Sequence, residues 1–71
     1  MKSYSIQATT ILGIDYDELK KILTIHFSNS TQGTYFDVPK YKIDLFLEVP
    51  NQESFYDANF KNRYHEVITS E

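Results

Sequence analysis

Cationic, amide and aromatic side chains alternate over residues 54–67, and this segment is the part of the sequence best suited to hold a ligand. Lys61 and Arg63 bring two positive charges within one helical turn. Arginine is the preferred donor for planar phosphate groups, and aromatic rings stack on bases. The candidate ligand-binding residues are Arg63, Lys61, Tyr64, Tyr56, Asn59 and, from a neighbouring strand, Tyr35. The alternative is that the rings form the core and the cations a solvated face.

Two other groups of side chains are of the types that take part in catalysis or metal binding. Asp15, Asp17 and Glu18 form the densest acidic cluster, which suits Mg²⁺ or acid–base chemistry but is equally typical of a solvated turn. The histidines are His26 and His65, whereas a zinc site needs three or four ligands and the chain has no cysteine. A structural histidine near a helix C-terminus explains His65, with a two-histidine site across a dimer as the alternative. The motif G-x-S-x-G and a Gly-rich phosphate loop are absent, so we expect no enzyme activity, cofactor or metal.

Length and charge limit the class of protein. Seventy-one residues suffice for one domain, residues 1–71, with a thin core. No stretch approaches the ~20 apolar residues of a membrane helix, and residues 1–5 do not resemble a secretory signal, so we expect a cytoplasmic protein without membrane contact. The net charge of −3 disfavours binding to nucleic acid through bulk charge. Six Tyr and five Phe are enough to build most of the core.

The first half of the chain predicts strands. Residues 4–16 carry β-branched side chains with imperfect alternation, which indicates one strand or two short pieces. Residues 21–27 alternate strictly and predict a half-buried strand. Its apolar face would consist of Leu23, Ile25 and Phe27. Residues 34–38 predict the hairpin partner of this strand, after a loop over residues 28–33.

A first helix is predicted between Pro39 and Pro50. Proline suits the first turn of a helix, and Asp37 is placed to accept hydrogen bonds from free N–H groups there. Pro50 would end the helix and hold Val49 in extended backbone. The apolar face would consist of Ile43, Phe46 and Leu47. The solvent side would carry Lys40, Lys42, Asp44 and Glu48.

A second helix is predicted over residues 54–67. Ser54 and Asp57 fit a capping box, and Asn51 is the competing cap. The apolar face would consist of Tyr56, Phe60, Tyr64 and Val67. The tail, residues 68–71, either frays or adds a short strand.

The order β-β-β-α-α predicts an α+β fold in which two helices pack on one face of a small three-stranded antiparallel sheet. The other face of that sheet would remain bare, and would carry Ile22, Thr24 and His26. Because an uncovered face of this kind is an interaction surface, we expect a homodimer or a higher homo-oligomer.

Five short blocks carry a resemblance to a known family. They are Ile11, Ile14, Tyr16 and Asp17; Leu23, Ile25 and Phe27; Tyr35, Val38 and Pro39; Phe46 and Leu47; and Phe55, Tyr56, Phe60, Lys61 and Tyr64. In this ordered set, which spans about residues 6–67, the chain resembles the KTSC family. That domain occurs at the C-terminus of some lysyl-tRNA synthetases and in short free-standing proteins, including phage-encoded ones. The chain departs from the family pattern at Asp15, Gly33, Val49, Asn51, Glu53 and Asp57.

The resemblance implies a KTSC-like fold and a non-catalytic accessory role. The cations, amides and rings of residues 54–67 lead us to expect that such a module binds or sequesters a small nucleotide-type ligand. For phage-type members the concrete version is an anti-defence sponge that sequesters a nucleotide immune signal of the host. The alternatives are an accessory RNA-binding domain, by analogy with the synthetase tail, and a protein–protein interaction domain that uses the bare face of the sheet.

Overall fold

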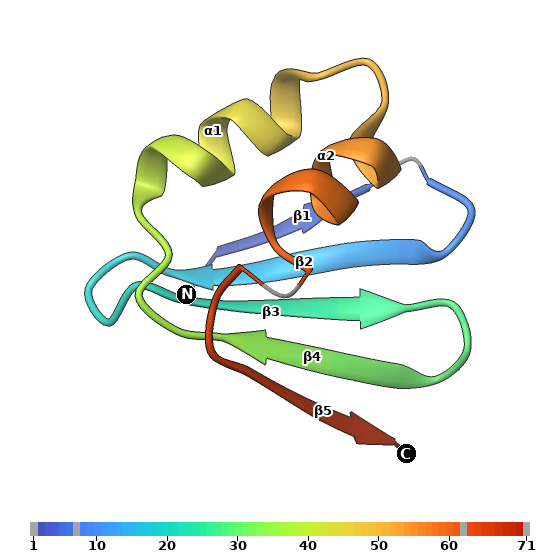
Figure 1. Ribbon diagram of the computed structural model, residues 1–71, viewed down its shortest axis with the longest axis horizontal. Coiled ribbons are helices and arrows are strands. Elements are labelled where there is room, and N and C mark those ends of the chain that lie inside the picture. Colours follow the sequence, from blue (N-terminus) through green and yellow to red (C-terminus); the bar gives the residue numbers. More distant parts are fainter. Residues whose placement is uncertain (1, 7, 62, 71) are drawn as a thin grey trace.

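The computed structural model describes residues 2–6, 8–61 and 63–70. This part of the chain forms a five-stranded antiparallel sheet and two helices (Figure 1). The elements are β1 (Lys2–Ser5), β2 (Ile11–Asp17), β3 (Ile22–Phe27), β4 (Thr31–Tyr35), α1 (Lys40–Glu48), α2 (Gln52–Asn59) and β5 (Glu66–Ser70). The strands neighbour one another in chain order, and both helices lie on the same side of the sheet. The α+β class is confirmed, but the predicted three-stranded sheet is wrong, because the sheet has five strands.

The two additional strands form the edges of the sheet. β1 arises because the segment predicted as one strand or two pieces reverses direction between Ser5 and Ile11, so that Ser5 pairs with Gly13. A bulge between Ile11 and Gly13 takes Leu12 out of the regular alternation. β5 arises from the tail, where the β-branched residues 67–69 suit extended backbone and pair with β4.

The hairpin of β3 and β4 is confirmed, with a tighter turn than predicted. Residues 28–30 connect the two strands, and the side-chain oxygen of Asn29 accepts a hydrogen bond from the backbone N–H of Thr31 at 3.3 Å. The strand predicted over residues 34–38 is therefore displaced toward the N-terminus. Asp37, with a φ of 59°, turns the chain out of the sheet and toward α1.

The ends of α1 follow from the two prolines. The carbonyl oxygen of Pro39 accepts a hydrogen bond from the backbone N–H of Lys42 at 3.1 Å. Asp37 does not cap the helix, which has no side-chain hydrogen bond at its N-terminus, so this expectation was wrong. Val49 is extended, with a ψ of 145°, as expected for the residue before Pro50.

α2 is shorter than the helix predicted over residues 54–67. It ends at Asn59, with Phe60 as its C-cap, and the end of the predicted helix lies in β5. The N-cap is Asn51, whose side chain accepts a hydrogen bond from the backbone N–H of Ser54 at 3.0 Å. Of the two predicted caps, Asn51 is therefore correct and the capping box of Ser54 and Asp57 is wrong. Within the described residues, no helix is long and apolar enough to span a membrane.

We expect Asn51→Ala to lower the free energy of unfolding by about 1 kcal/mol, because the N–H of Ser54 loses its acceptor. Ser54→Ala is the matched control, since its hydroxyl would matter only in the capping-box arrangement, and should change stability by less than about 0.5 kcal/mol. Urea unfolding measures both variants. An equal loss in the two variants would show that the helix start has been assigned to the wrong side chain.

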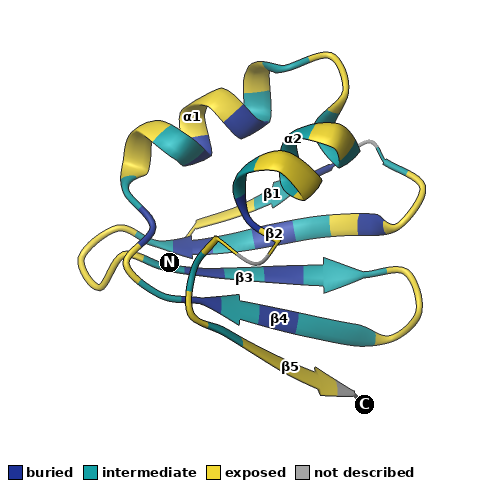
Figure 2. Ribbon diagram, in the orientation of Figure 1, coloured by how far each residue is buried: buried dark blue, intermediate teal, exposed yellow. Residues whose placement is uncertain are grey.

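Aromatic rings join the sheet to the helices. Tyr35 of β4, Phe46 of α1 and Phe60 after α2 are fully buried. The ring centroid of Phe60 lies 5.2 Å from that of Phe46 and 6.3 Å from that of Tyr35. Figure 2 shows buried positions on β2, β3 and β4, on α1 and at the end of α2, while β5 is largely exposed. The prediction that the rings mainly form the core is confirmed by these contacts. The buried set is Ile6, Ile11, Ile14, Tyr16, Leu23, Ile25, Tyr35, Val38, Ile43, Phe46 and Phe60.

Candidate functional site

Two of the predicted ligand-binding residues, Tyr35 and Tyr56, lie in the core instead of at the surface. Tyr35 is fully buried and Tyr56 half-buried, and their hydroxyl oxygens are hydrogen-bonded at 2.7 Å. The ring of Tyr56 also packs edge-on against Phe27, with centroids 5.6 Å apart. Burial raises the pKa of both hydroxyls, so both are neutral at pH 7. The two hydroxyls therefore satisfy each other, and this hydrogen bond links β4 to α2.

Three other predicted residues, Asn59, Arg63 and Tyr64, line one surface hollow of about 340 Å³. Lys42 and Ala58 complete its lining, and we name it the α1–α2 hollow. The ammonium group of Lys42 donates a hydrogen bond to the side-chain oxygen of Asn59 at 2.7 Å. The Nε–H of Arg63 donates to the backbone carbonyl of Ala58 at 3.2 Å. The fold therefore brings two cations from different segments to one place.

The neighbours of these side chains hold them in position. The amide nitrogen of Asn59 donates to the carbonyl of Phe55 at 3.1 Å, which orients its oxygen toward Lys42. The ring of Tyr64 packs against Phe60 with centroids 5.8 Å apart, and burial raises the pKa of the Tyr64 hydroxyl. The hollow thus combines fixed amide and phenol groups with the half-buried Lys42 and the exposed Arg63.

Lys61 is exposed and does not line the hollow, although the sequence pattern placed it beside Arg63. Lys42 takes its place. The sequence pattern assigned Lys42 to the solvent side of the first helix, and it lies 17 positions before its partner Asn59. No local spacing signals that contact. Asn62, which is interleaved with these residues in the sequence, lies outside the described residues.

Asp17 and His65 have structural partners. One carboxylate oxygen of Asp17 accepts hydrogen bonds from the backbone N–H groups of Leu19 at 3.1 Å and Lys20 at 3.2 Å, which closes the turn between β2 and β3. His65 packs against Phe36, with ring centroids 5.4 Å apart, directly before β5. The expectation that His65 sits at a helix C-terminus is wrong, because α2 ends six positions earlier, at Asn59. Among the described residues, no three His, Cys, Asp or Glu side chains are grouped to hold a metal ion.

Asp15 joins Ser3 and His26 on the face of the sheet opposite the helices. The hydroxyl of Ser3 donates to one carboxylate oxygen, and the other oxygen lies 2.7 Å from Nε2 of His26. Because the carboxylate lies between the hydroxyl and the imidazole, the histidine is not placed to take the proton of the serine. The group therefore lacks the geometry of a nucleophilic triad.

The chain is also similar to known proteins. The family model of the KTSC domain matches residues 7–64. The chain belongs to the KTSC family. No curated protein matches the chain. Among solved structures, the crystal structure of a KTSC domain protein from Yersinia pestis is similar, with a TM-score of 0.89 over 97% of each chain and 22% sequence identity. This likeness shows a shared fold.

In this KTSC domain, three residues that depart from the family pattern have structural roles. Asn51 caps α2. The carboxylate of Glu53 accepts hydrogen bonds from the backbone N–H and the hydroxyl of Thr10, at 3.1 and 2.6 Å, and so ties the loop before β2 to α2. Gly33 leaves room for the ring of Tyr35, since a Cβ there would lie 2.9 Å from that ring. None of the three lines the α1–α2 hollow.

The hydrogen bonds of Asp15 predict how the stability of this KTSC domain depends on pH. The hydroxyl of Ser3, and secondly His26, hold the pKa of the Asp15 carboxyl below its ordinary value of 3.8. A lowered pKa in the folded state adds stability that is complete above the unfolded pKa and lost as pH falls through the folded pKa.

We expect the wild type to be about 0.5–1 kcal/mol more stable than Asp15→Asn at neutral pH, because the carboxylate is partly exposed and its interactions are screened. The difference should shrink as the pH falls below about 4. Urea unfolding at a series of pH values measures it, and Ser3→Ala should remove part of the same pH dependence. A difference that stays constant down to strongly acidic pH would contradict the assigned role of these hydrogen bonds.

Proposed function

We propose that this KTSC domain is a cytoplasmic, non-catalytic module that binds a small nucleotide-type ligand at the α1–α2 hollow. The observation that supports the proposal is the convergence of Lys42 and Arg63 on one hollow that also holds an amide and a phenol ring. It retains three of the residues expected from the sequence, Asn59, Arg63 and Tyr64, and adds Lys42. Tyr35, Tyr56 and Lys61 are not part of the proposed site.

Each side chain of the hollow suits one part of such a ligand. A single hydrogen bond engages the Nε–H of Arg63, which leaves the outer N–H groups of the guanidinium directed to solvent and able to bind a phosphate in a bidentate manner. Lys42 adds a second positive charge on the neighbouring helix. The ring of Tyr64 offers a surface on which a base stacks, an interaction that contributes about 1–3 kcal/mol.

The concrete form of the proposal is a sponge that sequesters a nucleotide immune signal. A binding module needs no catalytic groups, and the described residues near the hollow include no base paired with a nucleophile. The runner-up is an accessory role in binding RNA, which the net charge of −3 disfavours. The salt dependence of the binding affinity distinguishes the two functions, because RNA binding through several phosphates weakens steeply as the salt concentration rises.

Isothermal titration against a panel of cyclic nucleotides and cyclic ADP-ribose isomers tests the proposal. We expect one member to bind, and Arg63→Ala and Lys42→Ala each to weaken that binding by about tenfold to a hundredfold, since each removes a charge-assisted hydrogen bond. Lys20→Ala is the matched control, because it removes one charge from the turn before β3, away from the hollow. Absence of heat with every member, for folded protein, would contradict the proposal. An equal loss in Lys20→Ala would show that bulk charge and not the hollow binds the ligand.

A further inference from the structure

Leu19 is the most exposed large apolar residue among those described. Its side chain is 96% exposed, at the tip of the turn over residues 18–21. The turn is fixed, because the carboxylate of Asp17 binds the backbone N–H groups of Leu19 and Lys20. The fold therefore presents an aliphatic side chain to solvent on a rigid support. Covering this side chain with another surface would be favourable, because apolar area would be removed from water.

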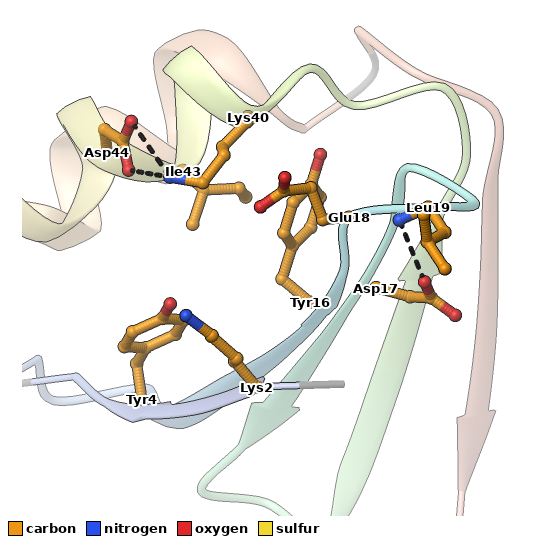
Figure 3. A pocket seen from close by; sticks show the side chains of 9 residues that line it. All are labelled: Lys2, Tyr4, Tyr16, Asp17, Glu18, Leu19, Lys40, Ile43 and Asp44. Atoms are coloured by element: carbon orange, nitrogen blue, oxygen red, sulfur yellow. Dashed lines mark hydrogen bonds and ion pairs between the residues drawn. The ribbon is translucent and has the colours of Figure 1, made fainter.

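A hollow with apolar walls lies directly beside this turn (Figure 3). The rings of Tyr4 and Tyr16 and the side chain of Ile43, from β1, β2 and α1, form its apolar walls, and Leu19 of the turn lines it as well. The hydroxyl of Tyr16 donates to the carbonyl of Val38 at 2.6 Å, so this ring presents mainly apolar surface to the hollow. We name it the Tyr4–Ile43 hollow.

The size of the Tyr4–Ile43 hollow suits one aliphatic side chain. Its volume is about 170 Å³. An apolar protein cavity of ~150 Å³ is known to take up a benzene molecule, which is comparable in bulk to the end of a leucine side chain. The same surface therefore carries a projecting leucine and, next to it, a hollow of matching size and polarity.

We infer that two copies of this chain associate about a two-fold axis at this surface, each placing its Leu19 in the Tyr4–Ile43 hollow of the other. In a two-fold contact the same patch is used by both copies, so a projection and a hollow side by side form two equal contacts at once. We choose a second copy as the occupant because its Leu19 matches the size and polarity of the hollow.

The charges around the contact are complementary in this arrangement. Glu18 and Lys20 flank Leu19 on the turn. Lys2, Lys40 and Asp44 line the hollow together with Glu18 itself, and Asp44 is bound to Lys40 at 3.2 Å. The patch therefore carries charges of both signs, as a surface that pairs with a second copy of itself requires. Such rim charges set the orientation of the two copies more than their affinity.

This contact differs from the one expected from the sequence, which used the bare face of the sheet. On that face His26 is already bound to Asp15, and Thr24 and Thr34 face each other across β3 and β4. The apolar groups of that face, Ile22 and Val67, lie among these polar ones, whereas Leu19 directly lines the Tyr4–Ile43 hollow. Lys42 and Arg63 do not line the Tyr4–Ile43 hollow, so we expect changes in one hollow to leave the other unaffected.

Light scattering over a concentration series up to the submillimolar range tests the inference. We expect the mass to rise from 8.4 kDa toward twice that value. Leu19→Asp should raise the dimer dissociation constant by about tenfold to a hundredfold, because a leucine no longer transfers into an apolar hollow. With a side chain that is 96% exposed, this variant keeps the fold, which circular dichroism verifies.

Two variants control for other surfaces. Leu12→Asp changes a leucine that is 63% exposed on the bulge of β2 and should leave the dimer intact. Thr24→Glu places a charge on the face of the sheet opposite the helices and should also leave it intact. A wild type that stays monomeric throughout overturns the inference. So does a Leu19→Asp variant that associates like the wild type, or a dimer that only Thr24→Glu dissociates. A mass that grows beyond two copies overturns the two-fold arrangement.

Discussion

Replacing Phe46 by alanine will lower the free energy of unfolding by about 3–5 kcal/mol. The ring is fully buried, and its centroid lies 5.6 Å from that of Phe55 and 5.2 Å from that of Phe60. Its removal leaves a cavity at the point where α1, α2 and the sheet meet. A loss of this size is a large part of the total stability of a small domain, so the variant will be partly unfolded near physiological temperature.

The matched control for this change is Tyr41→Ala on the same helix. The ring of Tyr41 is 61% exposed, so its loss should cost less than about 1 kcal/mol. Urea unfolding followed by circular dichroism compares the two variants with the wild type. A cost below about 1 kcal/mol for Phe46→Ala would mean that α1 does not pack on the sheet through this ring.

Gly33→Val will have the second largest effect, a loss of about 1–3 kcal/mol, because it overpacks the core. Gly33 is buried in β4 between Ile25 and Ile68 on the adjacent strands. A Cβ at this position would lie 2.9 Å from Cε1 of Tyr35 and 3.0 Å from Cδ1 of Ile68. The ring of Tyr35 cannot yield easily, since Phe60 and the hydroxyl of Tyr56 hold it. Valine adds two further methyl groups to this crowded point.

Thr34→Val is the matched control, because the neighbouring position faces the opposite side of the sheet and is only half-buried. It should change stability by less than about 0.5 kcal/mol. The tyrosine environment should also change in Gly33→Val alone, which near-ultraviolet circular dichroism detects. If both variants were equally stable, the close packing of Tyr35 over Gly33 would be refuted.

Local patterns predicted the inner part of the fold well. The alternation over residues 21–27 corresponds to β3. Of the residues expected on its apolar face, Leu23 and Ile25 are fully buried and Phe27 is half-buried. Pro39 and Pro50 set the ends of α1, because a missing N–H and a restricted preceding residue act within a few bonds. These features depend on neighbours in the sequence, so the sequence is sufficient to predict them.

The edges of the sheet and the end of α2 depended on longer-range pairing. Helical spacing relates Tyr56, Phe60, Tyr64 and Val67. Val67 nevertheless lies in β5 and pairs with Thr34 of β4. β4 would otherwise leave a row of backbone groups unpaired, and a strand of β-branched residues meets that need better than a longer helix. Gly33 shows the same effect. The composition of residues 28–33 indicates a loop, yet Gly33 lies in β4 beneath Tyr35, where only a residue without a side chain fits.

The sequence by itself determined the α+β class, the aromatic core, the limits of α1 and the family, because each depends on local periodicity or on an ordered set of residue types. Only the tertiary structure decided which cations share a hollow. Arg63 shares its hollow with Lys42 and not with Lys61, which is close to it in the sequence. The reason is that α1 packs against the end of α2 and so brings side chains together that are distant in the sequence. It likewise revealed the hollow beside Leu19, whose walls combine the consecutive strands β1 and β2 with α1, which lies far from them along the chain.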